Sequence, residues 1–213
     1  MAQCTFGPMT VLRQNGFEIH KGHLPVERQE VMLDAVRNVV RAAPLFHPVT
    51  ARGKPMSVRM TSAGEVGWVS DRRGYRYERN HPNGGAWPEI PEEIRAIWDD
   101  LSASDHGPTC CLINFYAEAA RIGLQQDRDE GTFDAPVVST SLGAAGLFRM
   151  GGAERSSPTS SSWRESGDCV VMGGKARLAF HGVDRIKPGP SPLMPKGGRI
   201  NITLRFVALE IYS

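Results

Sequence analysis

From Thr109 onward the sequence divides into short apolar, β-branched or aromatic runs separated by Gly, Pro or Ser clusters. Runs of this kind at regular spacing are typical of a β-sandwich, barrel or jelly roll. We therefore predict a mainly β core over 109–207, in which the polar, Ser-rich stretch 152–166 is a loop. The predicted strands cover 110–116, 122–127, 136–142, 146–150, 168–172, 177–181 and 199–207.

Two segments before this region have helical periodicity. Pro25 opens a stretch whose apolar residues recur at helical spacing until Pro44, which predicts a helix over about 26–42. A second helix is predicted to start at Pro91, because Ile94, Ile97, Trp98 and Leu101 then share one face. The predicted fold class is mainly β with flanking α-helices.

Length and composition predict one globular domain. The chain has 213 residues, 40% of them hydrophobic and 23% charged, which is ordinary for a soluble protein with a single core. The net charge of +2 does not indicate a partner, but 52–79 carries seven Lys or Arg and three acids. That local excess predicts either a phosphate-facing rim or a solvated loop region.

Cysteine usage and hydropathy predict the compartment. Cys110 and Cys111 are adjacent, so they point to opposite faces of a strand, and Cys4 and Cys169 form no CxxC pair with them. A disulfide framework and structural zinc are therefore not expected, which favours the reducing cytoplasm. The sequence has no basic segment followed by an apolar run and no long apolar stretch, so we expect neither a signal peptide nor a membrane span.

Three polar positions in the predicted core could hold a metal ion. Gln125 and Asp127 are two residues apart, so on a strand they face the same side. His181 is the sole histidine after His106. Each feature also has an ordinary explanation, since polar-x-Asp pairs are common and a histidine beside an apolar run is often structural.

The last predicted strand alternates polar and apolar residues. Arg199, Asn201, Thr203 and Arg205 share one face, opposite a face of Ile, Leu and Phe. Such a polar face can simply face water, or its arginines can bind a carboxylate in a bidentate manner. The arginines are roughly 20 Å apart along the strand, so they serve one small ligand only if their side chains converge.

These polar residues occur in a fixed order among several longer stretches. The stretches are 55–61, 67–77, 87–88, 112–116 (LINFY), 126–130 (QDRDE), 135–143, 151–152, 167–168, 173–174, 181–182 and 199–205 (RINITLR). From about 54 to 207 the chain resembles the bacterial AlkB-type nucleic-acid demethylases, which depend on iron(II) and 2-oxoglutarate. The resemblance implies a double-stranded β-helix, or jelly roll.

The resemblance also implies a ligand set. Asp127 and His181 correspond to the family's iron ligands, and the family's other histidine falls on Gln125, a doubtful ligand. Iron(II) and 2-oxoglutarate are the implied cofactor and co-substrate. The residues implied to bind 2-oxoglutarate are Arg199, Tyr116 and Asn201 at its distal carboxylate, and Arg205 with Asn114 at the other.

The implied substrate is alkylated single- or double-stranded DNA, with RNA as an alternative. Trp68 and His181 would sandwich the flipped base, Tyr75 would contact the backbone, and Asp129 would meet the positive charge of the methylated base. Glu130 with Arg155 would brace that aspartate. Met60 and Arg155 complete the implied substrate-binding set.

The resemblance divides the single domain into a helix-bearing extension over about 1–53, a nucleotide-recognition lid over 54–90 and the jelly-roll core over 109–207. A monomer is expected.

Gln125 departs from the family pattern, and three explanations stay open: a natural substitution in a divergent member, an introduced substitution, or a slipped alignment. The function is correspondingly an oxidative demethylase, an impaired member that binds alkylated nucleic acid, or a related oxygenase with another substrate. Imidazole suits iron far better than a neutral amide oxygen does.

Overall fold

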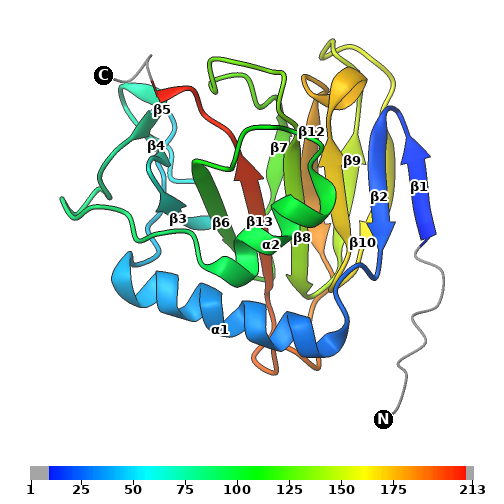
Figure 1. The fold of residues 1–213 in the computed structure, drawn as a ribbon, viewed down its shortest axis with the longest axis horizontal. Helices are drawn as coiled ribbons and strands as arrows, with labels where there is room; N and C mark the ends of the chain where they lie inside the picture. Colours follow the sequence, from blue (N-terminus) through cyan, green and yellow to red (C-terminus); the bar gives the residue numbers. More distant parts are fainter. Residues whose placement is uncertain (1–9, 210–213) are drawn as a thin grey trace.

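The computed structural model describes residues 10–209, which form a β-sandwich with two helices outside it (Figure 1). The major sheet has seven strands in the order β1-β2-β11-β8-β13-β6-β3, and the minor sheet has four in the order β10-β9-β12-β7. A separate hairpin consists of β4 and β5. The predicted jelly-roll fold is confirmed. The strands are β1 (Thr10–Gln14), β2 (Phe17–Lys21), β3 (Arg59–Gly64), β4 (Gly67–Asp71), β5 (Gly74–Glu78), β6 (Cys110–Tyr116), β7 (Ile122–Gln125), β8 (Val137–Gly143), β9 (Gly146–Met150), β10 (Ser160–Arg164), β11 (Cys169–Met172), β12 (His181–Ile186) and β13 (Arg199–Arg205).

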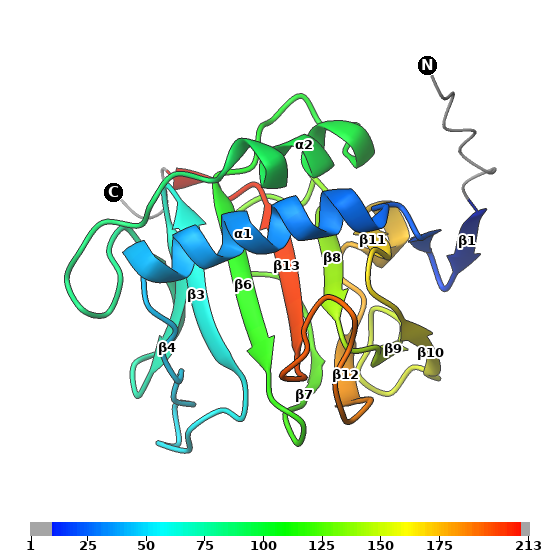
Figure 2. The ribbon, with the colours of Figure 1, turned by 90° about the horizontal axis from the view of Figure 1, so that it is seen from below.

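Both predicted helices are present and lie on the outer face of the major sheet (Figure 2). They are α1 (Val26–Ala42) and α2 (Glu92–Leu101). Their buried faces pack with the apolar side of the sheet in one core cluster, to which β13 contributes Ile200, Ile202 and Leu204. Neither helix is long and apolar enough for a membrane crossing.

Strand β13 is the central strand of the site because it lies between β8 and β6. Both pairings are antiparallel, and the second places Arg199 opposite Tyr116 and Asn201 opposite Asn114. Since the apolar residues of β13 face the helices, its polar residues face the minor sheet. The alternation seen in the sequence thus directs four polar side chains into the sandwich.

Two segments after Thr109 were wrongly predicted from the sequence. Residues 177–181 are not a strand: the short 3₁₀ helix η1 (Gly174–Ala176) is followed by a turn, and His181 begins β12 rather than ending a strand. The reason is Arg177, whose buried guanidinium donates to the carbonyls of Ala135 and Asp127 and holds a turn. Within the predicted loop 152–166, β10 pairs with β9 at the sheet edge, where polar serines can stay partly exposed.

Strands also occur before Thr109, where none was predicted. β2 pairs with β11 and β3 pairs with β6, so both are integral to the major sheet. The β4–β5 hairpin lies beyond β3, at the side of the major sheet away from β1 (Figure 1). Gly67 lets this hairpin approach Trp87, because a Cβ there would overlap the Trp87 ring.

Candidate active site

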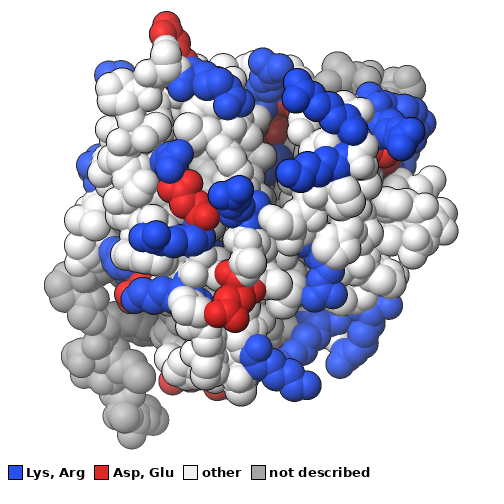
Figure 3. Space-filling view, turned by 180° about the vertical axis from the view of Figure 1, so that it is seen from behind, with Lys and Arg blue, Asp and Glu red and all other residues white. Residues whose placement is uncertain are grey.

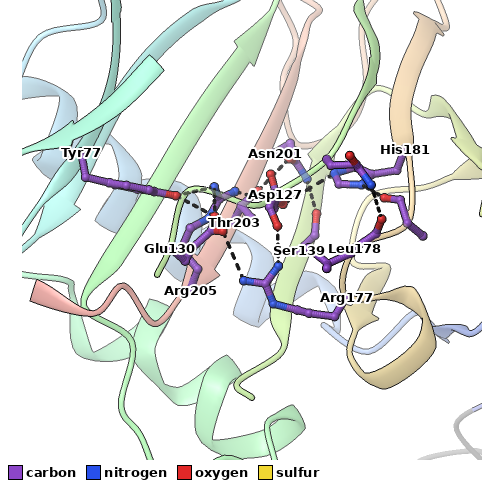
Figure 4. Close-up of polar contacts among 12 residues, drawn as sticks. Tyr77, Asp127, Glu130, Ser139, Arg177, Leu178, His181, Asn201, Thr203 and Arg205 are labelled. Atoms are coloured by element: carbon purple, nitrogen blue, oxygen red, sulfur yellow. Dashed lines mark hydrogen bonds and ion pairs between the residues drawn. The ribbon is translucent and has the colours of Figure 1, made fainter. Parts of the chain in front are cut away.

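A cavity of about 410 Å³ opens between the two sheets and the β4–β5 hairpin. It brings together every residue proposed from the sequence except Arg199, which lies outside its lining. Figure 4 shows the polar contacts within it. The candidate residues that line it are Met60, Trp68, Tyr75, Asn114, Tyr116, Gln125, Asp127, Asp129, Arg155, His181, Asn201 and Arg205.

Asp127 and His181 meet inside this cavity. The distance from Asp127 Oδ2 to His181 Nε2 is 3.6 Å, and both side chains are buried. The Nδ1 of His181 lies 3.0 Å from the carbonyl of Ala179. When Nδ1 donates to that carbonyl, Nε2 presents its lone pair beside the carboxylate, which is the usual arrangement of a metal-binding histidine.

The loop that carries Asp127 is fixed from both sides. The side-chain amide of Gln126 donates to the carbonyls of Ala153 and Leu178, at 3.0 and 2.7 Å. Arg177 donates to the Asp127 carbonyl at 2.7 Å. These contacts hold the loop, so the Asp127 carboxylate is positioned even before a metal binds.

Gln125 lies opposite His181 in the β7–β12 pairing and lines the same cavity. Its side chain makes no hydrogen bond that involves the described residues 10–209. Within that range no three His, Cys, Asp or Glu side chains form a metal-binding group. The site thus fits a divalent metal through one imidazole and one carboxylate, and Gln125 can add a neutral oxygen.

Electrostatics keep the Asp127 carboxylate ionised. Burial by itself would raise its pKa, but Arg205, His181 and Arg177 together hold the pKa below its usual value. The Arg205 guanidinium is close, with Nη2 at 3.4 Å from Asp127 Oδ2. A deprotonated carboxylate is what a metal site requires.

Arg205 is held by a buried cluster around Glu130. Its Nη1 donates to the hydroxyl of Tyr77 at 2.8 Å and to Glu130 Oε1 at 3.2 Å. Tyr77 donates to the same Glu130 oxygen at 2.8 Å, and Arg177 lies 3.3 Å from the other oxygen (Figure 4). Two cations and a hydroxyl therefore surround one carboxylate, which fixes the guanidinium of Arg205 beside the cavity.

Glu130 and Arg155 were expected to brace Asp129, and that brace stays a prediction. Arg155 donates to the carbonyl of Leu124 at 3.2 Å, and its guanidinium lies over the Phe180 ring. The buried carboxylate of Glu130 is satisfied by Arg177 and Arg205, which are buried with it. Arg155 stays at the cavity rim, where it is exposed.

Arg199 is a buried cation behind the cavity, and no carboxylate of the described residues pairs with it. Its guanidinium donates to Ser141 Oγ at 2.6 Å and to the carbonyls of Ala144 and Arg164, while Nε has no partner in the structure. It forms no ion pair with any described residue, and burial lowers its pKa to about 10. It pairs in register with Tyr116, which lines the cavity. An anionic ligand beside Tyr116 would supply the missing charge, so the site fits a dicarboxylate.

Two asparagines face each other on β13 and β6. Asn201 is fixed, because its amide donates to Ser139 Oγ at 2.8 Å and to the Thr140 carbonyl, and its oxygen accepts from Thr203. Asn114 lies directly opposite, and its buried Oδ1 has no hydrogen-bond partner in the structure. An unsatisfied buried oxygen in a cavity is a site for a bound donor.

Aromatic rings form the mouth of the cavity. Trp68 on β4 and Tyr75 on β5 are stacked, with ring centroids 5.4 Å apart and an interplanar angle of 22°. Tyr75 is 56% exposed, so this pair is accessible from solvent. Met60 is buried deeper. At the rim, burial and the neighbouring Glu130 raise the pKa of Asp129.

The sequence profile of the 2OG-Fe(II) oxygenase superfamily matches residues 16–205. The chain belongs to this superfamily. It is 48% identical over 199 residues to an alpha-ketoglutarate-dependent dioxygenase AlkB homolog of Caulobacter vibrioides, covering 93% of this chain and 90% of that one. It is 37% identical to the alpha-ketoglutarate-dependent dioxygenase AlkB of Escherichia coli, covering 83% of each. In fold it is similar to the solved structure of OsALKBH1, with a TM-score of 0.75, 30% identity and coverage of 93% of this chain and all of that one.

Because the chain belongs to this superfamily, iron(II) is its cofactor and 2-oxoglutarate its co-substrate. Tyr77 and Arg177 contact its functional side chains but were not among the sequence-predicted site residues. Arg177 had a recognisable signal: it is a lone cation in the apolar run 176–180, where a charged residue needs a buried partner. The contact of Tyr77 with Arg205 joins residues 128 positions apart, so no local pattern could reveal it.

Proposed function

We propose that this oxygenase is an oxidative demethylase of N-alkylated bases in DNA, of the 1-methyladenine and 3-methylcytosine type, and that it releases formaldehyde. The observation that carries the proposal is the shared cavity: stacked aromatic rings at its mouth and the Asp127–His181 pair inside. An extruded base can stack on an aromatic ring whatever its sequence context. The similarity to AlkB proteins supports the same substrate class.

The groups inside the cavity are suited to 2-oxoglutarate. Arg199, with Tyr116 and Asn201, would bind its distal carboxylate, because Arg199 is a buried cation that lacks an anion. Arg205, whose guanidinium lies 3.4 Å from Asp127, would bind the other carboxylate of the co-substrate together with the side-chain amide group of Asn114. The bound metal supplies the oxidation of the methyl group, while the protein residues fix the reactants and exclude water.

The groups at the mouth are suited to an alkylated base. Trp68 and His181 would sandwich it, and Tyr75 would contact the strand. Methylation at these ring nitrogens gives the base a positive charge, which the carboxylate of Asp129 would complement. Met60 and Arg155 would complete the contact from the cavity wall and the rim.

A second candidate function follows from Gln125. With one imidazole and one carboxylate as the strong ligands, metal occupancy falls, and the cavity would then bind alkylated nucleic acid with little turnover. We further propose that the protein also acts on RNA, that it is a monomer and that it is located in the cytoplasm. The described cysteines are buried free thiols, which supports a reducing compartment.

Product release decides between the two functions. The protein, supplied with iron(II) and 2-oxoglutarate, is incubated with a single-stranded oligonucleotide that contains one 1-methyladenine, and formaldehyde and succinate are measured. Asp127→Ala is the control for metal-dependent turnover. Stoichiometric release of both products supports the demethylase. Selective binding of the methylated strand without either product supports the binding function, and neither binding nor release contradicts both.

A further inference from the structure

The outer face of the minor sheet carries an aromatic side chain covered by two cations. Trp163 on β10 is partly buried, and above its ring lie the Arg185 guanidinium, at 5.9 Å from the ring centroid, and the Lys187 ammonium, at 5.3 Å. Attraction between cations and an indole ring holds such side chains in place. We call Trp163, Arg185 and Lys187 the Trp163 face.

The two cations of the Trp163 face are not neutralised. Both are exposed, and neither forms an ion pair with a residue in the described range. The nearby carboxylate of Asp184 is already paired with Arg149, at 2.7 Å. Glu165, the nearest acid to Trp163 along the chain, is exposed and lies just after the end of β10. Two positive charges are thus available to an anionic partner.

Positive and negative side chains also gather on different sides of the molecule. Figure 3 shows the side that faces away from α2, where Lys and Arg outnumber the acidic side chains. The segment 89–105, which contains α2 on the other side, has six acids and one arginine. A polyanion would therefore be attracted to the side of the protein that faces away from α2.

Strand β12 connects the Trp163 face to the active site. It begins at His181, which lines the cavity, and reaches Arg185 four residues later, roughly 13 Å further at ~3.3 Å per residue. That distance corresponds to about four nucleotides at 3.4 Å each. A strand whose base enters the cavity can extend along β12 to the Trp163 face.

We propose that the Trp163 face is a second nucleic-acid contact, which binds the phosphate backbone of the strand whose base enters the cavity. The inference rests on the proposed function, because it assumes a nucleic-acid substrate. Arg185 and Lys187 bind phosphates, and Trp163 holds their side chains over the sheet. Phosphate contacts position a strand and carry no sequence information, so this contact is independent of methylation.

Strand length and salt provide the test. Fluorescence anisotropy measures the affinity of single strands of about 5 and about 20 nucleotides, with and without a central 1-methyladenine, over a salt series. Each phosphate contact changes the slope of log affinity against log salt by about 0.7, or roughly 5-fold in affinity at about 0.1 M salt. The double variant Arg185→Gln/Lys187→Gln should therefore bind the long strand roughly 25-fold more weakly. The short strand, which ends before the Trp163 face, should be unaffected.

Two control variants separate this contact from general electrostatics and from folding. Arg37→Gln/Arg41→Gln removes the same charge from exposed positions on α1 and should leave both affinities unchanged. Arg185→Lys/Lys187→Arg keeps both charges and should retain the long-strand affinity. An equal loss in the α1 variant, an equal loss for both strand lengths, or no loss for the long strand would overturn the proposal. The unmethylated long strand tests the Trp163 face even if the protein fails to distinguish methylated bases, which would count against the proposed function alone.

Discussion

The guanidinium of Arg205 lies 3.4 Å from the carboxylate of Asp127, so a cation proposed to bind the co-substrate touches an anion proposed to bind the metal. Both are buried, and Glu130 and Tyr77 hold the arginine in place. Binding of metal and of 2-oxoglutarate should therefore be coupled. The metal would compensate the charge of Asp127 and a carboxylate of 2-oxoglutarate that of Arg205, and these two side chains already pair with each other.

Arg199→Ala should weaken 2-oxoglutarate binding, because it removes charge-assisted hydrogen bonds worth roughly 1.5–3 kcal/mol. Arg199→Lys should restore only part of the affinity, since an ammonium cannot present a planar fork. Calorimetric titration of 2-oxoglutarate into the metal-loaded protein measures the difference. Unchanged affinity in Arg199→Ala would show that this buried cation serves only the packing behind the cavity.

Arg205→Ala should also weaken 2-oxoglutarate binding, by a similar amount. The same substitution removes a cation from Glu130, so thermal unfolding of the variant must be followed beside the titration. A destabilised protein whose 2-oxoglutarate affinity is intact would assign Arg205 to the buried charge cluster alone.

Trp68→Ala should weaken binding of a methylated oligonucleotide by about 1–3 kcal/mol, the range for loss of one stacked base. Anisotropy with a short 1-methyladenine strand measures this loss, and 2-oxoglutarate affinity serves as the control that should not change. Should the oligonucleotide bind as before, the Trp68–Tyr75 stack is part of the hairpin packing and not a base platform.

Glu130→Gln should lower the free energy of unfolding by about 3 kcal/mol, because it leaves the buried cation Arg177 without its carboxylate and leaves Arg205 with Asp127 alone. Urea denaturation gives the value, and Glu118→Gln at an exposed position is the matched control. A change in Glu130→Gln as small as that in the control would mean that the cluster is not a source of stability.

Stability should decrease in mild acid because of the buried His23, which precedes α1, and the partly buried His20 beside it. Burial lowers the pKa values of His20 and His23; Glu18 and Asp100 oppose this shift, while Arg13 and Arg28 add to it. Below pH ~6.5 the unfolded chain takes up protons that the folded chain resists, so stability is present above that pH and is lost as the pH falls. Unfolding free energies at pH 7.5 and 5.5 should differ less in His23→Gln than in the parent. Equal differences would exclude His23 as a cause.

The sequence predicted the fold best where strands are buried and end at glycine or proline. β6 and β9 were predicted with the bounds that the structure shows, because their apolar runs are flanked by turn residues. β1 was not predicted, since its exposed side chains follow no apolar alternation, and β5 was not predicted because its Tyr-Arg-Tyr alternation is too short to identify a strand. Their formation depends on pairing with neighbouring strands, which a local pattern does not record.

The site was predicted through its resemblance to AlkB proteins more than through any single motif. That resemblance brought Trp68, Asp127 and His181 together although they come from three separate segments. It did not give the partners of Glu130 or the contacts behind Arg199, because these depend on side-chain packing across the sandwich.

The central claim is that the site is a metal-dependent oxygenase centre limited by Gln125. Side-by-side titration of iron(II), with formaldehyde release from a 1-methyladenine strand, in the parent and in Gln125→His tests it most directly. Replacing the amide by a strong imidazole ligand should raise both metal affinity and turnover, by more than the ~10–100-fold typical of groups that act through a ligand. Equal iron affinity and equal formaldehyde release in the two proteins would contradict the account, because an amide or a water would then complete the centre as well as a histidine.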